Sequence, residues 1–170
     1  LDPGAQPETV RDAVQRLGLR PAMILLTHGH FDHVGAVRPL AAAWGLPVYL
    51  HEADAALPPS ITDGPLYYTD IYEEGSTVLL DSLRFSVWHT PGHTPGSVCL
   101  QCSNLLFTGD TLFAGACGRT DLPGGNPGQM AASLRRLAAI QEDYTLLPGH
   151  GGASTLQREQ RTNPYLRMLP

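Results

Sequence analysis

Four side chains that could bind a metal ion fall within six residues of the stretch LLTHGHFDH, which runs from Leu25 to His33. His28 and His30 can reach the same point from an extended chain, because side chains at alternate positions share a face. Asp32 and His33 follow where the chain turns into its next element, so they can reach a second point nearby. Neutral imidazoles and carboxylates are the usual ligands of zinc and related divalent ions. The stretch therefore predicts metal binding.

Further polar side chains follow other apolar stretches that are typical of strands. His51, His89 and His150 come at or just after such stretches, Asp110 ends the stretch FTGD, and His93 lies one short turn beyond His89. A single histidine of this kind is usually solvated or hydrogen-bonded within the protein. However, loops at the carboxyl ends of strands in an α/β sheet converge on one edge, where ligands bind. The shared placement favours one common site.

The elements that must position these residues alternate along the chain. Hydrophobic periodicity and turn residues predict helices at 7–17, 34–44, 129–140 and 154–162. The same signals predict strands at 22–26, 47–51, 77–80, 83–89, 97–102, 104–109 and 144–149. Residues 57–70 and the Gly/Pro-rich stretch 109–128 are expected to be loops. This alternation predicts an α/β fold, and the length predicts a single domain over residues 1–170.

Composition excludes several classes of function. The net charge of −5 comes without a basic stripe, which argues against a nucleic-acid partner. No apolar run approaches the length of a membrane span, so no membrane partner is expected. Cys99 and Cys102 fall on opposite faces of a predicted strand, which favours plain packing, whereas Cys117 lies in a glycine-rich loop. An odd number of cysteines is compatible with a reducing compartment, and we expect a cytoplasmic location.

Four motifs in order carry a resemblance to a known family. The pattern His28-x-His30-x-Asp32-His33 is followed by TPGHTPGS (90–97), FTGDTLF (107–113) and PGHG (148–151). Together they resemble the metallo-β-lactamase fold superfamily, and more narrowly the single-domain glyoxalase II-like (hydroxyacylglutathione hydrolase-like) hydrolases. The resemblance runs over essentially the whole chain and implies an αββα sandwich. Members of that family begin with strands before the motif matched by LDPG, so the resemblance implies a domain without its first N-terminal strands.

The resemblance also implies two adjacent divalent metal ions, with zinc expected first and iron or manganese as alternatives. It places the first ion on His28, His30 and His93, the second on Asp32, His33 and His150, and Asp110 as a bridge between them. Asp2 matches a family position behind the ligands, from which a carboxylate can orient a histidine. His51 matches no family ligand, and His89 is expected to support the site or to pack.

The activity implied by the resemblance is hydrolysis of a small-molecule glutathione thioester such as S-lactoylglutathione. A hydroxide shared by the two cations would attack the carbonyl, with Asp32 as the catalytic carboxylate that orients it. A thiol leaving group, with a pKa of about 8.5, departs without help from a general acid. Arg119, in GRTD (118–121), would either contact glutathione or form an internal ion pair. Both interpretations remain open, and the oligomeric state is not determined.

Two other activities of the same fold are compatible with the motifs. One is a persulfide dioxygenase that binds a single iron, and the other is a lactonase. Aspartate rather than cysteine at position 110 argues against hydrolysis of β-lactams, because the related zinc β-lactamases carry a thiolate at the matching position.

Overall fold

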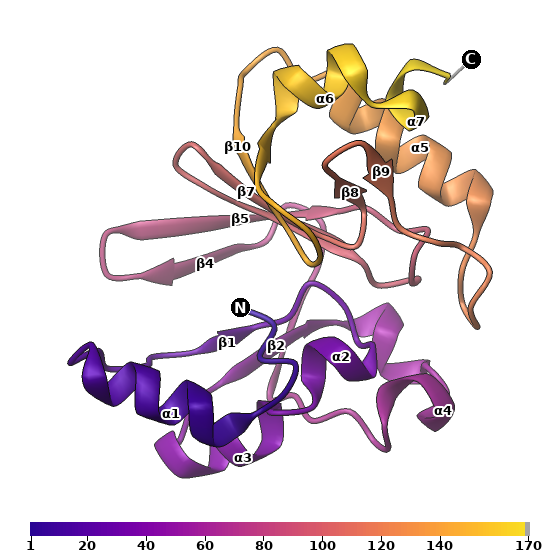
Figure 1. Cartoon of the computed structure of the whole chain (residues 1–170). Helices are drawn as coiled ribbons and strands as arrows, with labels where there is room; N and C mark the ends of the chain where they lie inside the picture. The colour runs from indigo at the N-terminus through magenta and orange to yellow at the C-terminus, as the bar shows by residue number, and fades with distance from the viewer. Residues whose placement is uncertain (169–170) are drawn as a thin grey trace.

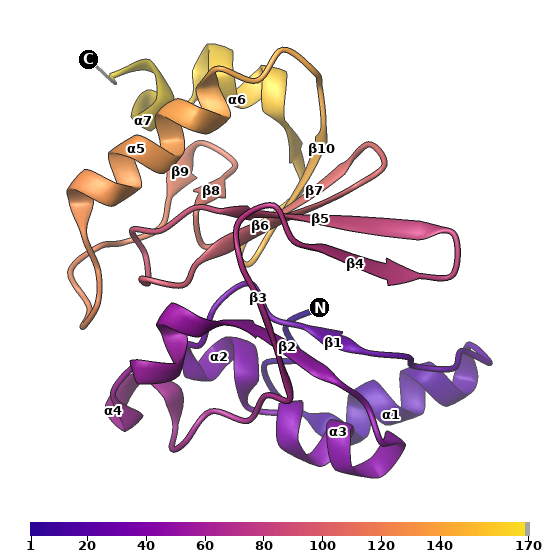
Figure 2. The same ribbon diagram turned by 180° about the vertical axis from the view of Figure 1, so that it is seen from behind.

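The computed structural model describes residues 1–168 and consists of four layers, in which two sheets face each other and helices cover both outer faces (Figure 1). The αββα arrangement expected from the sequence is confirmed. The first half of the chain contains α1 (Pro7–Arg16), β1 (Ile24–Leu25), α2 (Phe31–Val34), α3 (Val37–Trp44), β2 (Val48–His51), η1 (Glu52–Ala56), α4 (Pro59–Thr62) and β3 (Asp70–Tyr72). Seen from behind, β3 leads the chain from this half to the second sheet (Figure 2).

The second half of the chain builds the larger sheet and its helices. It contains β4 (Thr77–Leu80), β5 (Leu83–His89), β6 (Val98–Cys102), β7 (Leu105–Gly109), β8 (Leu112–Phe113), β9 (Ala116–Cys117), α5 (Pro127–Ala138), β10 (Thr145–Pro148), β11 (Ser154–Thr155), α6 (Leu156–Thr162) and α7 (Pro164–Arg167). The strand order of this sheet is β11-β10-β7-β6-β5-β4, and β8 pairs with β9 in a separate hairpin. Strands β7 and β10 are parallel, so their carboxyl ends lie at the same edge.

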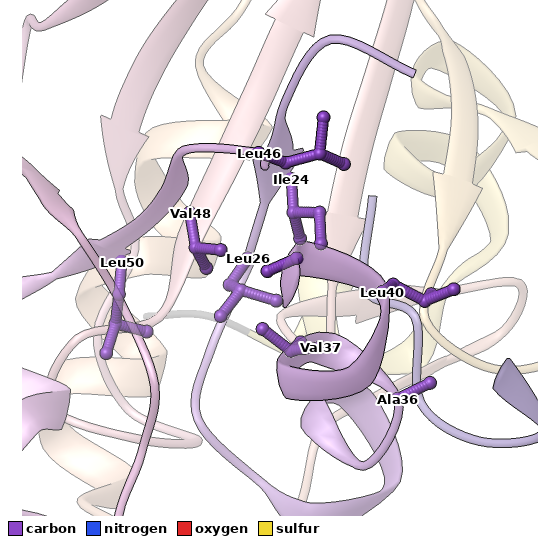
Figure 3. Close-up of a cluster of buried hydrophobic side chains, with 9 residues drawn as sticks. Ile24, Leu26, Ala36, Val37, Leu40, Leu46, Val48 and Leu50 are labelled. Carbon is purple, nitrogen blue, oxygen red and sulfur yellow. The ribbon is translucent and has the colours of Figure 1, made fainter. Parts of the chain in front are cut away.

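The first sheet has the parallel order β1-β2-β3. Ile24 and Leu26 point into a core that is shared with α3, where Val37 and Leu40 are also buried (Figure 3). Leu25, between them, points the other way and packs in a core with residues of the second sheet. The uninterrupted apolar run of this segment is therefore explained by burial of the strand on both faces.

Some of the helices and strands predicted from the sequence have the same bounds in the structure, and others have different bounds. Strands 77–80 and 83–89 are confirmed as β4 and β5, and the helix predicted at 7–17 is α1. The helix predicted at 34–44 is α3, which begins only at Val37, and the separate short helix α2 precedes it. The expected loop 57–70 contains the short helix α4, the expected loop 109–128 contains the β8–β9 hairpin, and α7 was not predicted. The helices α4 and α7 have four residues each and the strands β8 and β9 two each, which is too short to show a helical or a strand period in the sequence.

The cysteines agree with one of the expectations from composition. Cys99 and Cys102 are buried free thiols on β6, as expected of packing residues. Within residues 1–168, none of the helices combines the length and the apolar character needed to cross a membrane.

Candidate metal centre

Loops that leave the carboxyl ends of several strands bring together the seven predicted metal ligands. The segment that follows β1 and runs into α2 carries four of them, the turn between β5 and β6 carries His93, and Asp110 and His150 follow β7 and β10. These residues form three overlapping groups whose possible ligand atoms lie within 4.8 Å of one another. We call the seven residues the histidine–aspartate cluster: His28, His30, Asp32, His33, His93, Asp110 and His150.

The first group contains three buried imidazoles, those of His28, His30 and His93. His30 Nδ1 lies 2.8 Å from His93 Nε2, so these two nitrogens face a common point. On the other side of its ring, His93 Nδ1 donates a hydrogen bond of 2.8 Å to the carbonyl of Arg119. Because a carbonyl only accepts, this bond places the proton of a neutral His93 on Nδ1. Nε2 is then an acceptor, which faces His30 Nδ1 and has the lone pair that could bind a cation.

The second group contains Asp32, His33 and His150. His150 Nε2 lies 3.1 Å from Asp32 Oδ2 and 3.3 Å from His33 Nε2. His33 is buried, whereas Asp32 and His150 are exposed. This side of the cluster is therefore the more accessible one for a substrate.

The third group, His28, His33 and Asp110, overlaps the other two, and Asp110 lies between them. Its Oδ2 is 3.4 Å from His93 Nε2 and 3.5 Å from His150 Nε2, and its Oδ1 is 3.5 Å from His33 Nε2. Gly149 makes this approach possible, because a Cβ atom there would lie 2.3 Å from Asp110 Oδ1. The carboxylate thus has the placement that the sequence predicts for a bridge.

The hydrogen-bonding state of these side chains tests whether metal ions fit here. Among the residues that the structure describes, three buried side-chain polar atoms have no hydrogen-bond partner: His28 Nε2, His30 Nε2 and Asp110 Oδ1. All three belong to the histidine–aspartate cluster. An unpaired buried polar atom costs about 1–3 kcal/mol, and a bound cation would satisfy the lone pairs of His28 Nε2 and Asp110 Oδ1. In His30 it is Nδ1 that faces His93 Nε2. Nitrogen and carboxylate donors in this ratio suit divalent transition metals, so the residues fit such ions.

The electrostatic surroundings hold the deeper imidazoles in the neutral form that binds metals. Burial, reinforced by the neighbouring histidines, lowers the pKa of His28 well below its usual value and that of His30 to about 4. For His33, burial works against protonation, but the hydrogen bond to Asp2 and the nearby carboxylates outweigh it and raise the pKa. Burial raises the pKa of Asp110, against the opposing influence of the nearby histidines.

Asp2 lies behind the cluster, where the sequence predicts it. Its Oδ1 accepts a hydrogen bond of 2.7 Å from the amide of Thr27, and its Oδ2 accepts one of 2.6 Å from the hydroxyl of the same residue. Oδ2 also lies 3.2 Å from His33 Nδ1. Asp2 therefore fixes both the start of the histidine loop and the orientation of His33.

His51 and His89 lie outside the cluster. Their rings stack on each other with centroids 4.1 Å apart. His89 Nε2 donates a hydrogen bond of 2.8 Å to the carbonyl of Pro95, in the loop that carries His93. His89 thus packs on His51 and holds the loop that carries His93.

A cavity of about 640 Å³ lies over the cluster. Arg119 lines it and forms an exposed ion pair with Asp121, at 2.6 Å between Nε and Oδ1. Part of the wall is apolar and comes from Phe31, Ile61, Phe113 and Leu122. The sequence did not point to this apolar wall, because Ile61 and Phe113 lie in stretches that were expected to be loops.

The comparison with protein families decides the relationship. The model of the metallo-beta-lactamase superfamily matches residues 1–150. The chain belongs to the metallo-beta-lactamase superfamily. The resemblance seen in the four sequence motifs is thereby confirmed.

Relatives within the metallo-beta-lactamase superfamily span nearly the whole chain. Hydroxyacylglutathione hydrolase GloC of Haemophilus influenzae is 35% identical, over 98% of this chain and 85% of that protein. The crystal structure of TTHA1623 in a di-iron-bound form is 44% identical with a TM-score of 0.86, over 96% of this chain and 87% of that one. BLEG-1 B3 metallo-beta-lactamase is 34% identical with a TM-score of 0.90, over 97% and 86% of the two chains. The family and these relatives support a metal-dependent hydrolase.

Proposed function

We propose that the protein is a dinuclear metal-dependent hydrolase of thioesters, with glutathione thioesters such as S-lactoylglutathione as the leading candidates. The observation that carries the proposal is the pair of ligand groups with Asp110 within 3.5 Å of a ring nitrogen in each. Similarity to a hydroxyacylglutathione hydrolase supports the substrate class. Zinc is the first candidate metal, and the di-iron form of TTHA1623 makes iron a strong second one.

Each part of the cluster has a defined role in this proposal. His28, His30 and His93 would hold one cation, Asp32, His33 and His150 the other, and Asp110 would contact both. When bound, such a pair of cations supplies Lewis acidity, which activates water and stabilises negative charge on a carbonyl oxygen. Asp32 lines the cavity, so its carboxylate can accept a hydrogen bond from the attacking water and orient it.

The shape and chemistry of the cavity suit a thioester. The apolar wall offers a surface for the carbon chain of the substrate next to the polar cluster. The thiol that is released has a pKa of about 8.5, so it can leave as a thiolate without a proton from the protein. Arg119 can offer its guanidinium to a carboxylate of the substrate, in competition with Asp121.

The test combines metal analysis with an assay on the same preparation. Protein loaded with zinc should hold close to two equivalents and release free thiol from S-lactoylglutathione, and removal of the metal with EDTA should abolish this activity. The control is His51→Ala, because His51 lies outside the cluster, and this variant should still hold close to two equivalents of zinc and keep most of the activity. One equivalent of iron, with oxygen consumed in the presence of glutathione persulfide and intact thioesters, would establish the dioxygenase instead.

Hydrolysis of β-lactams is a second candidate, and it rests on the similarity to BLEG-1. Nitrocefin and a simple lactone therefore belong in the same assay. We expect kcat/KM for the glutathione thioester to exceed the values for both. The reason is that the thiolate released from a thioester is a good leaving group and needs no proton from a general acid. A larger kcat/KM for nitrocefin would make the protein a β-lactamase, and a larger value for the lactone would make it a lactonase.

A further inference from the structure

Asp54 is a fully buried carboxylate in η1, outside the histidine–aspartate cluster. Its Oδ2 accepts a hydrogen bond of 2.8 Å from the amide of Gly29 and one of 2.9 Å from the hydroxyl of Thr94. Its Oδ1 accepts a bond of 2.6 Å from the amide of Gly96. The carboxylate thus has three donors, and each comes from a loop that carries metal ligands.

Two of these donors are next to metal ligands in the sequence. Gly29 lies between His28 and His30, and Thr94 directly follows His93. One carboxylate therefore joins the two loops that supply the first group of ligands. The second group has no such bond to Asp54, since its buried member His33 is oriented by Asp2.

We infer that Asp54 is a positioning residue, which holds His28, His30 and His93 at the spacing that the first metal ion requires. The inference rests on the proposed metal sites and adds a residue that acts on one of them and not on the other. A buried charge is costly unless donors surround it, and here the donors are parts of the two ligand loops. Partners that orient metal ligands typically contribute about 10- to 100-fold to metal affinity.

The packing around Asp54 leaves little room for another arrangement. A Cβ atom added at Gly96 would lie 2.7 Å from Asp54 Oδ1, so the loop approaches the carboxylate as closely as a glycine permits. Burial raises the pKa of Asp54 to about 6, while the three donors favour the ionised form. At pH 7.5 the group is therefore a carboxylate that can hold all three donors.

The decisive variant is Asp54→Asn, which has nearly the same shape. Its amide NH₂ group must face one of the N–H or O–H donors, so at least one tie between the loops is lost. Metal-free protein at pH 7.5 is titrated with zinc against a chromophoric chelator. We expect the wild type to bind two equivalents tightly, and Asp54→Asn to bind one of them about 10- to 100-fold more weakly. The visible spectrum of the cobalt-loaded variant should change accordingly.

Glu159→Gln is the matched control, because Glu159 is also a buried carboxylate with three donors. Those donors are Gly115, Ser154 and Asn163, and none of them is adjacent to a metal ligand. This control should lower the stability of the metal-free protein and leave both zinc affinities unchanged. If Asp54→Asn does not fold, Thr94→Val removes one donor with little change of shape, and a smaller loss of affinity at one site is expected.

The outcomes separate the two proposals. Equal zinc affinities in the wild type and in the Asp54 or Thr94 variant would overturn the role of Asp54 and leave the proposed function intact. Equal losses at both sites would also overturn it, since they would indicate a general structural role. A wild type that binds no metal would overturn both proposals together.

Discussion

At the scale of single residues, Asp110 is the side chain on which both ligand groups depend. It lies within 3.5 Å of ring nitrogens from each group. Asp110→Ala should therefore weaken both metal sites and lower kcat by more than the ~10- to 100-fold that loss of an indirect partner costs. Zinc titration and thiol release measure the two effects. His51→Ala is the control, and similar mild effects from both variants would contradict the bridging position.

Arg119 can be tested through its partner. Arg119 and Asp121 form an ion pair whose side chains are 61% and 67% exposed, so loss of the pair should change stability little. If the guanidinium binds a carboxylate of glutathione, Arg119→Ala should raise KM severalfold at unchanged kcat. Asp121→Ala, which frees the guanidinium, should lower KM. A fall in melting temperature with KM unchanged in Arg119→Ala would instead show an internal structural pair.

The residues also show where sequence analysis of a site succeeds and where it stops. The ligands in LLTHGHFDH could be recognised because their chemistry is concentrated in one short segment. Asp54 could not be recognised from the sequence, because its donors Gly29 and Gly96 are 25 and 42 positions away. In addition, an acidic residue usually faces solvent. Only the fold brings that carboxylate between the two loops.

At the scale of elements, short segments escaped prediction although they shape the site. The β8–β9 hairpin has strands of two residues each, and α4 has four residues that begin with a proline. Neither is long enough to show periodicity, whereas the seven residues of β5 are. Phe113 on β8 and Ile61 on α4 nevertheless line the cavity. The walls of the site were therefore less predictable than its ligands.

Glu159 joins α6 to two neighbouring segments, and its contribution should depend on pH. Burial opposes ionisation of Glu159, but hydrogen bonds from Ser154, Gly115 and Asn163 outweigh it and lower the pKa below the usual 4.5. A lowered carboxyl pKa stabilises the folded state above about pH 4.5, and this stabilisation is lost as the pH falls through the folded-state pKa. Glu159→Gln should therefore cost about 1–3 kcal/mol at pH 7.

Urea denaturation of the metal-free protein at pH 7 and at pH 4 measures this effect. The difference in unfolding free energy between the wild type and Glu159→Gln should be smaller at pH 4 than at pH 7. A difference that stays constant, or grows toward acid, would show that the Glu159 carboxylate is not the source of the stabilisation.

At the scale of the whole molecule, the histidine–aspartate cluster takes its ligands from both halves of the sandwich, whose two sheets face each other (Figure 1). Four ligands come from the segment that follows β1 and runs into α2, and the other three come from the half that contains the larger sheet. Metal ions would bind the complete set of ligands only in the folded state, because unfolding separates the two halves. Their binding energy therefore adds to the stability of the fold. Free metal at 1,000 times its dissociation constant stabilises the native state by about 4 kcal/mol per site.

Removal of the metal should therefore lower the melting temperature substantially. At about 4 kcal/mol for each of the two ions, removal of both corresponds to a shift of roughly 16–32 °C for a chain of this size. Calorimetry with and without EDTA measures it. Asp110→Ala is the matched control, because it should bind metal weakly and lose little on addition of EDTA. An unchanged melting temperature in the wild type would mean that the ions do not join the two halves. If EDTA lowers the melting temperature strongly in the wild type but not in Asp110→Ala, the stabilisation depends on metal ions held by Asp110.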